Sequence, residues 1–245
     1  MNEATLTKMK QMKLYGMQNA FKTAIETGKT DHFTMDQFVA MLVDSEWDER
    51  HNRRIERSIK NAKFHYKSNI EEINFDSTRN LDRNLVLRLA ECEFVTKNEN
   101  ILITGSTGVG KSFLGTAIGY QACIEGFKVF YFNTSKLFAK LKMAKADGSY
   151  LRELTKIQRQ DVIILDDFGL QALDSTNRIT LLEIIEDRHN NGSLIITSQI
   201  PVQGWYDIIG EKTIADAILD RLVHKAHRIE LKGESMRKKR TLNKT

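Results

Sequence analysis

The sequence predicts an α/β fold, an αβα core with a parallel sheet, preceded by a small all-helical N-terminal domain. From residue 68 onward, short apolar segments alternate with stretches long enough to be crossover helices, which is typical of a parallel sheet covered on both faces. Residues 1–66 contain no proline, only two glycines, and apolar positions at helical spacing. We therefore predict a helical adaptor or interaction domain over 1–66 and the α/β domain, with a basic C-terminal tail, over 67–245.

The helical domain ends in a strongly basic stretch. Residues 50–67, RHNRRIERSIKNAKFHYK, contain seven Lys or Arg and one acidic residue. Its apolar residues recur at spacings of three and four, which places them on one helical face and leaves the other face to the basic side chains. We expect this cationic face to contact DNA phosphates, and the alternative is a solvated charged face. The expected contacts are Arg53, Arg54, Arg57 and Lys60.

Five segments of the α/β domain are predicted as strands, because they are short, apolar and rich in β-branched or aromatic residues. They are residues 101–104, 128–133, 162–165, 193–197 and 227–231. Residues 134–160, between the second and third strands, are predicted to form two helices broken at Asp147-Gly148.

The stretch GSTGVGKS, residues 105–112, follows the first strand, opens a helix and matches the phosphate-loop pattern G-x-x-x-x-G-K-[ST]. Its glycines allow successive N–H groups to point at phosphate oxygens, and the helix N-terminus adds a positive dipole. Lys111 would supply charge to the β and γ phosphates, and the Ser112 hydroxyl would hold Mg²⁺. The alternative is a glycine-rich turn without a ligand. The expected nucleotide contacts are Gly105, Ser106, Thr107, Gly108, Val109, Gly110, Lys111, Ser112 and Phe113.

A second apolar strand ends in two carboxylates, in the stretch DVIILDDFG at residues 161–169. In this arrangement the first acid, Asp166, helps to hold Mg²⁺, and the second, Asp167, polarises an attacking water. Neighbouring acids at a strand end repel each other unless a cation is near. The alternative is a solvated turn after a strand.

Polar residues also close another predicted strand, in IITSQIP at residues 195–201. Ser198 and Gln199 are candidates to orient the lytic water or contact the γ-phosphate, because strand ends of a parallel sheet gather around the ligand. The alternative is a plain turn opened by the only proline. Further along the chain, Arg221 and Arg237 are of the residue type that binds phosphate and stabilises charge during phosphoryl transfer.

Composition and charge narrow the class of protein. Hydrophobic residues at 41% and charged residues at 28% describe a soluble globular protein, and we expect a cytoplasmic one without a signal peptide or a membrane partner. Cys92 and Cys123 lie far apart, which argues against a disulfide framework or a zinc site. The net charge of +5 is concentrated in residues 50–67 and 232–244, which favours a polyanionic partner.

Taken together, these motifs resemble the IstB family, the ATP-binding helpers of insertion-sequence transposases. The resemblance lies in the phosphate loop, in LYGMQNAF, VIILDDFG and IITSQIPVQGWYDIIG, and above all in residues 213–238. The family is similar to the DnaC-type helicase loaders within the AAA+ ATPases. It implies an AAA+ P-loop core, ATP and Mg²⁺ as cofactors, a homo-oligomer with nucleotide at each interface, and duplex DNA and the transposase of the same element as partners.

The resemblance also implies residue roles. Arg221 takes the place of the arginine finger that reaches the neighbouring subunit's ATP, and Arg237 takes that of the second sensor on its own nucleotide. At Asp167 the sequence departs from the common AAA+ pattern, where Glu is more usual, and the shorter acid suggests slow hydrolysis. By resemblance to initiators and loaders, the helical insert faces bound DNA. Its expected contacts are Lys140, Lys142 and Lys145, and the alternative is a solvated helix face.

These expectations combine into one hypothesis, an ATPase that oligomerises on duplex DNA and helps a transposase to select or engage its target. Three alternatives stay open. A helicase loader would use the same core, and a small-molecule kinase would use the same phosphate loop with an acceptor pocket and a lid. A DNA scaffold that holds ATP without cleaving it is compatible with Asp167.

Overall fold

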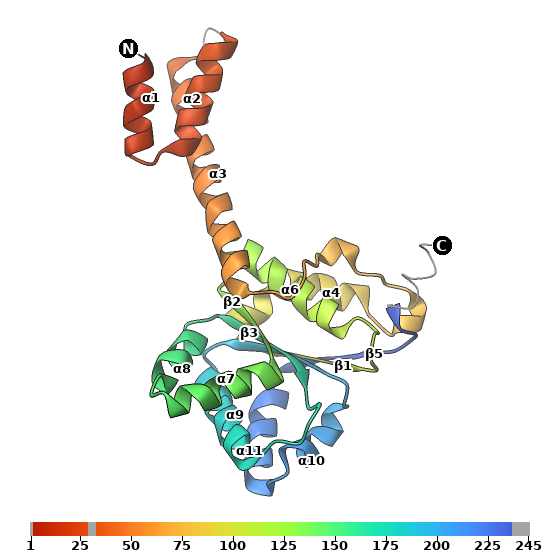
Figure 1. The fold of residues 1–245 in the computed structure, drawn as a ribbon. Coiled ribbons are helices and arrows are strands. Elements are labelled where there is room, and N and C mark those ends of the chain that lie inside the picture. The colour runs from red at the N-terminus through yellow and green to blue at the C-terminus, as the bar shows by residue number, and fades with distance from the viewer. Residues whose placement is uncertain (1, 29–32, 237–245) are drawn as a thin grey trace, which may run out of the picture. The chain divides into compact units, whose positions relative to one another are not determined.

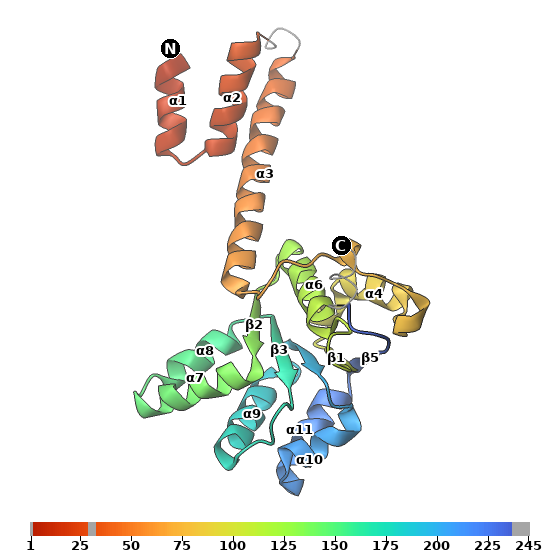
Figure 2. The ribbon, with the colours of Figure 1, turned by 45° about the vertical axis from the view of Figure 1, so that its right-hand side comes forward.

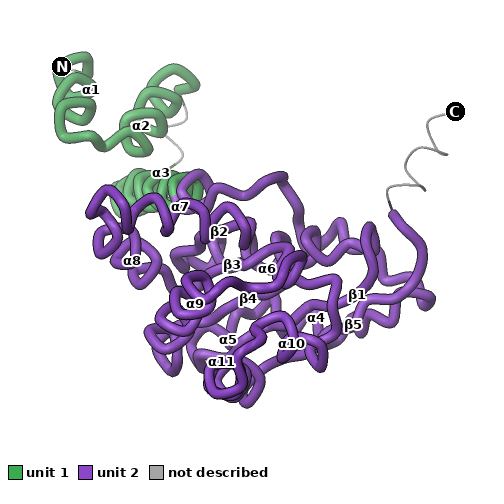
Figure 3. Tube along the Cα trace, turned by 60° about the horizontal axis from the view of Figure 1, so that its bottom comes forward, with its two compact units in different colours: residues 1–57 green, residues 58–245 purple. Residues whose placement is uncertain are grey.

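The computed structural model describes residues 2–28 and 33–236, and the chain divides into two compact units, Met1–Arg57 and Ser58–Thr245 (Figure 3). The division falls inside one helix, α3 (Met35–Ala62), whose last residues belong to the second unit. The compact units and the predicted domains thus divide at different residues, and the functional roles of the two domains stay predictions.

The first unit is helical, as predicted, and consists of α1 (Asn2–Gln11), α2 (Tyr15–Thr27) and the first part of α3 (Figure 1). The Gly16 N–H at the start of α2 donates to the Glu46 carboxylate of α3 at 2.8 Å. A Cβ on Gly16 would lie 2.2 Å from the Ser45 carbonyl oxygen, so the two helices approach closely at a glycine. Among helices of the described ranges, none is long and apolar enough to cross a membrane.

The second unit alternates strands and helices in the predicted order. Its strands are β1 (Asn100–Gly105), β2 (Val129–Asn133), β3 (Val162–Phe168), β4 (Ser193–Ser198) and β5 (Ala226–Leu231). Its helices are α4 (Arg83–Ala90), α5 (Glu93–Thr96), α6 (Lys111–Ile124), α7 (Thr134–Ala146), α8 (Tyr150–Gln158), α9 (Ser175–Arg188), α10 (Trp205–Ile209) and α11 (Lys212–Val223), with short 3₁₀ turns η2 (Ile70–Glu72), η3 (Ser77–Arg79) and η4 (Val202–Gly204). Every predicted strand is confirmed, with ends that differ by at most three residues.

The five strands form one parallel sheet in the order β2-β3-β4-β1-β5. Alternate residues of a strand face opposite sides. Ile101 and Ile103 belong to an apolar cluster with residues of α4 and α6, whereas Leu102 belongs to a cluster with residues of α7, α9 and α11. Figures 1 and 2 show the same division, with α6 on one side of the sheet and α7, α9 and α11 on the other. The αβα core is confirmed.

Helix α6 packs directly on the sheet because its inner face carries small residues. A Cβ on Gly119 would lie 2.5 Å from the Ile164 Cδ1 atom, and Cys123 is fully buried one turn later. Cys92 and Cys123 are both buried free thiols. Burial raises the pKa of Cys92 to about 12 and that of Cys123 to about 11. The close approach of α6 fixes the loop that precedes it over the carboxyl ends of the strands.

The predicted helical insert is confirmed as α7 and α8. The Asn133 side chain caps α7 by accepting the Lys136 N–H at 3.3 Å. Helix α7 ends at Ala146, and Gly148, with a left-handed φ of 76°, turns the chain into α8. The break therefore falls at the Asp147-Gly148 step that the sequence indicates.

Candidate nucleotide-binding site

The phosphate-loop sequence joins β1 to α6 at the carboxyl edge of the sheet. Strand β1 ends at Gly105, and α6 begins at Lys111 with Gly110 as its N-cap. Gly108 and Gly110 have left-handed φ angles of 86° and 96°, which glycine adopts without steric cost. Such a backbone lets successive N–H groups converge at a helix N-terminus, where an anion is favoured.

Two side chains of the loop make contacts that hold its shape. Lys111 is buried, and its Nζ donates to the Ser106 carbonyl at 2.8 Å. Thr107 Oγ1 donates to Gln199 Oε1 at 2.7 Å, which brings the end of β4 against the loop. Lys111 and Gln199, two of the predicted site residues, therefore lie at the same loop.

The side chains of Val109 and Phe113 pack against other parts of the protein. Val109 is fully buried in the apolar cluster beside α6. The Phe113 ring stacks on the Tyr66 ring, with centroids 6.4 Å apart. The contribution expected of Val109 to nucleotide binding thus falls to its backbone.

Asp166 lies in β3 and is nearly buried, with 4% of it exposed. The hydroxyl groups of Tyr131 and Thr197 each donate to one of its carboxylate oxygens. Burial, and next the bond to this carboxylate, raise the pKa of Tyr131, so the phenol stays a proton donor at neutral pH. The two hydroxyls fix the orientation of the carboxylate and leave lone pairs for a further ligand.

Asp167 follows directly but has different neighbours. Its φ of 58° is left-handed, at a point where the register of β3 and β4 shifts between Leu165 and Phe168. Its N–H donates to Thr197 Oγ1 at 3.1 Å, and Asn133 Nδ2 donates to its carboxylate at 3.3 Å. Both acids lie within β3, because pairing with β4 continues beyond the irregularity.

Ser112, Asp166 and Asp167 line one cleft of about 670 Å³, together with Lys136 and Tyr131. Magnesium in proteins takes oxygen ligands, usually one or two carboxylates with substrate phosphates. The hydroxyl and the buried carboxylate fit that preference, so Ser112 and Asp166 would hold the ion. When bound, it would neutralise charge on the phosphates.

The Ser198 hydroxyl bonds to backbone groups outside the phosphate loop. It is fully buried, and its Oγ donates to the Phe168 carbonyl at 2.7 Å and accepts the Ile200 N–H at 3.0 Å. These bonds fix the turn after β4. Of the two candidates at this strand end, Gln199 contacts the phosphate loop and Ser198 supports the backbone beside it.

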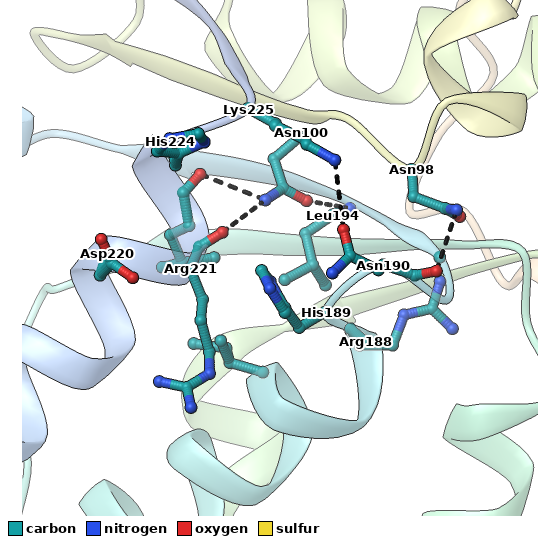
Figure 4. A pocket seen from close by; sticks show the side chains of 13 residues that line it. Asn98, Asn100, Arg188, His189, Asn190, Leu194, Asp220, Arg221, His224 and Lys225 are labelled. Carbon is teal, nitrogen blue, oxygen red and sulfur yellow. Dashed lines mark hydrogen bonds between the residues drawn. The ribbon is translucent and has the colours of Figure 1, made fainter.

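Arg221 lies near the amino ends of the strands, whereas the phosphate loop lies at their carboxyl ends. The side chain of Asn100, the first residue of β1, donates to the carbonyls of Arg221 and Leu222 at 3.4 and 3.1 Å (Figure 4). The Arg221 guanidinium pairs with Glu186 at 3.5 Å. Because β1 begins beside Arg221 and ends at the phosphate loop, the two features lie at opposite ends of one strand. Arg237 lies outside the described residues.

The predicted DNA contacts on α3 are basic side chains with different surroundings. Arg53 lies over the Tyr15 ring, 4.4 Å from its centroid, and pairs with Glu49 at 2.6 Å. The exposed residues of this set are Arg54, Arg57 and Lys60. Three of the four therefore offer an accessible charge.

The predicted DNA contacts on α7 are all exposed, and two have intramolecular partners. Lys140 pairs with Glu153, and hydrogen bonds from Lys140 and Lys156 lower the pKa of Glu153 to about 2. Lys145 donates to Thr180 Oγ1 at 3.1 Å. Lys142, the third predicted contact on α7, is exposed. Contact with DNA on α7 stays a prediction, and phosphates would compete there with Glu153.

Several residues of the site were not anticipated from the sequence. Tyr131 and Asn133 come from β2, and Arg79 from η3, where Nη2 donates to the Val109 carbonyl at 2.7 Å. No local pattern marks them, because each reaches the site from a segment with no motif of its own. Thr197 has a usable signal, since it belongs to the polar end of β4, although the residues predicted there are Ser198 and Gln199.

Comparison with known proteins shows which family the chain belongs to. The family model of the IstB-like ATP binding proteins matches residues 7–244. The chain belongs to this family. A relative from Sinorhizobium fredii, named as an insertion sequence ATP-binding protein, is 42% identical to this IstB-like protein, and the match covers 96% of each chain.

Solved structures show the fold of the IstB-like protein. The DnaC helicase loader is 23% identical with a TM-score of 0.56, over 70% of this chain and 100% of the other. The DnaA protein of Aquifex aeolicus, solved with bound AMPPCP, is 18% identical with a TM-score of 0.60, over 75% of this chain and 57% of the other. The IstB-like protein therefore has the AAA+ P-loop fold.

Proposed function

We propose that this IstB-like protein hydrolyses ATP, assembles as a homo-oligomer on duplex DNA in the cytoplasm, and helps the transposase of its insertion sequence to engage target DNA. Membership of the family supports ATP binding and the insertion-sequence context. Residues 1–66 would be the adaptor that meets the transposase, DNA or a neighbouring subunit.

The positions of Arg221 and the phosphate loop at opposite ends of β1 carry the proposal. The strand has six residues, so its ends are about 17 Å apart. An arginine that stabilises a transferring phosphate must come within bonding distance of it. Arg221 is out of reach of a nucleotide on its own loop, and a second copy of the chain would supply it.

The other roles follow from the cleft. The loop backbone and Lys111 would hold the β and γ phosphates, and Ser112 and Asp166 would hold Mg²⁺. Asp167 would orient the attacking water. Gln199 would contact the γ-phosphate from the end of β4, a role supported by its bond to Thr107. Arg237 would be the second sensor, as the family resemblance implies.

A subunit-mixing experiment tests the shared site. Lys111→Ala removes the phosphate contact, and Arg221→Ala removes the arginine supplied to the neighbour, so each variant alone should lose ATP hydrolysis. In an equal mixture, about a quarter of the interfaces combine an intact Lys111 with an intact Arg221. Hydrolysis should return in the mixture. No recovery, with both variants folded and associating, would contradict a site shared between subunits.

DNA binding is tested by particle mass on long duplex DNA in ATP and in ADP. ATP and duplex together should give a large assembly, and Lys111→Ala on its own should lose DNA binding, because no interface between its own copies holds a nucleotide and it fails to assemble. Equal DNA binding by that variant, with or without nucleotide, would rule out coupling between ATP and DNA. Capture of a transposase, rather than a replicative helicase, by residues 1–66 distinguishes the proposal from a helicase loader.

A non-hydrolysing DNA scaffold is the second candidate, and Asp167 favours it. The acid is shorter than the usual Glu, and Asn133 donates to its carboxylate. A scaffold would keep bound ATP intact over many rounds of DNA binding. Release of phosphate that depends on Asp167 would exclude it.

A further inference from the structure

Two segments that are far apart in the sequence close over the phosphate loop. The first is residues 74–80, around η3, and the second is residues 231–236, at and after the end of β5. A Cβ on Gly108 would lie 2.2 Å from Ser235 Oγ, and one on Gly110 would lie 2.8 Å from a guanidinium nitrogen of Arg79. The loop is therefore packed against both segments.

Arg79 joins the first segment to the loop. Its side chain is buried, with Nη2 donating to the Val109 carbonyl at 2.7 Å and Nη1 donating to the Asn74 carbonyl. Burial lowers the pKa of Arg79, and the field of Asp76 opposes that shift. A buried cation whose donors meet neutral carbonyls gains stability when an anion binds nearby.

The second segment is bonded to both Arg79 and the loop. The Lys232 N–H donates to the Arg79 carbonyl at 3.0 Å, and the Met236 N–H donates to the Gly108 carbonyl at 2.9 Å. A closed circuit of hydrogen bonds thus runs from Val109 through Arg79 to Lys232, and from Met236 back to Gly108.

We propose that Arg79 is a positioning residue of the nucleotide site, which transmits nucleotide occupancy of the phosphate loop to residues 231–236. The inference rests on nucleotide binding at the loop, as in the proposed function, and names a path by which that binding is reported. When loop N–H groups bond to phosphate oxygens, the carbonyls of the same peptide units become better acceptors, because linked hydrogen bonds polarise one another. The bonds from Arg79 and Met236 to those carbonyls strengthen together.

The consequence concerns the basic tail. The sequence after Met236 contains five Lys and Arg residues. The circuit ends at Met236, directly before those residues, so nucleotide exchange would change how firmly the chain is held at that point. This is a route by which ATP controls affinity for a polyanion without a change in the net charge of the protein.

Hydrogen exchange at the Lys232 and Met236 amides tests the proposal, because these N–H groups form the circuit. It is measured on the full chain without nucleotide, with ADP, and with AMPPCP and Mg²⁺. In the parent protein AMPPCP should slow both amides by about tenfold or more. Arg79→Met removes the charged donors at similar length, and it should abolish that slowing at the Lys232 amide, which is linked to the loop through Arg79. AMPPCP should still protect the phosphate-loop amides and the Met236 amide, which bonds to the Gly108 carbonyl directly. Arg79→Lys, which lacks the fork of donors, should show a smaller slowing.

Asn80→Gly is the matched control. Asn80 Nδ2 donates to the Glu230 carbonyl at 3.0 Å, so it fastens the same segment to β5. Its φ of 53° is left-handed and suits glycine. Protection of Lys232 and Met236 in this variant should match the parent protein.

The outcomes are distinct. Full protection of the Lys232 amide in Arg79→Met overturns the proposal, and so does equal loss of that protection in Arg79→Met and Asn80→Gly. If Arg79→Met does not fold, Arg79→Lys decides, and protection equal to the parent overturns the proposal. If AMPPCP protects no phosphate-loop amide in the parent protein, nucleotide does not bind there, and both the proposed function and this path are overturned.

Discussion

The backbone at Asp167 selects for a short acid. Its φ of 58° lies in the left-handed region, where Asp and Asn are enriched among non-glycine residues because their short polar side chains bond locally. The bonds to Thr197 and from Asn133 hold the residue there. A side chain one methylene longer would adopt this backbone at a higher cost, which gives a physical reason for Asp at a position where AAA+ ATPases more usually carry Glu.

Asp167→Asn is expected to keep the fold and ATP binding while lowering hydrolysis about 100-fold, because Asn tolerates the backbone but cannot act as a base. Asp167→Glu is expected to cost about 1 kcal/mol of unfolding free energy. Urea unfolding and phosphate release, measured on the same preparations, separate the two effects. Unchanged hydrolysis in Asp167→Asn would mean that another group activates the water.

Thr197 serves both acids with one buried hydroxyl, which donates to Asp166 and accepts the Asp167 N–H. Thr197→Val keeps the shape and removes both bonds, so it should cost about 2 kcal/mol of unfolding free energy. It should also raise the Mg²⁺ concentration needed for ATP binding, because the Asp166 carboxylate loses one of its two hydroxyl donors. Thr197→Ser keeps the hydroxyl and is the control. Equal stability of the Val and Ser variants would contradict this role.

The site residues that the sequence predicts are those with a local pattern. The phosphate loop and the acid pair can each be recognised from a short continuous stretch of sequence. Tyr131 meets Asp166 across 35 residues of chain, and Arg79 meets Val109 across 30. Their roles arise only from folding, so no spacing rule could find them. Ser198 shows the reverse case, because a strand-end position does not say which way a hydroxyl points.

At the scale of elements, runs of apolar residues predicted where the strands lie but not the residues at which they end. The run in β3 stops at Leu165, yet pairing resumes at Phe168 opposite Ser198. Polar residues inside a strand thus hid its true length. The helical domain was likewise predicted to run through residue 66, because the helical pattern does not change at Arg57, where the compact units divide.

Gly119 tests why α6 lies so close to the sheet. Helix propensity favours Gly119→Ala by about 1 kcal/mol. The added Cβ would lie 2.5 Å from Ile164 Cδ1 and 3.3 Å from a Phe64 ring carbon, so overpacking should outweigh propensity and destabilise the protein by about 2 kcal/mol. Thermal or urea unfolding measures the sign. A stabilised variant would mean that α6 shifts freely away from the sheet.

At the scale of the whole chain, the second compact unit includes the end of α3. Ser58 Oγ donates to the Phe127 carbonyl at 3.0 Å, and Ala62 is fully buried in the core beside α6. A fragment of residues 67–245 lacks both contacts, whereas 58–245 keeps them. We expect the shorter fragment to be less stable by about 3 kcal/mol, because apolar surface of the core is uncovered. Equal urea midpoints for the two fragments would contradict this boundary.

The two buried thiols give the molecule a chemical reporter of its own unfolding. Alkylating reagents attack thiolates, and the raised pKa values of Cys92 and Cys123 leave almost none in the folded protein at about pH 8. The unfolded chain ionises its thiols at about pH 8.5, so modification proceeds through opened molecules. A nucleotide that binds only the folded form lowers the open fraction by the factor 1 + [L]/Kd. The alkylation rate at rising ATP concentration therefore yields a dissociation constant without any label on the nucleotide.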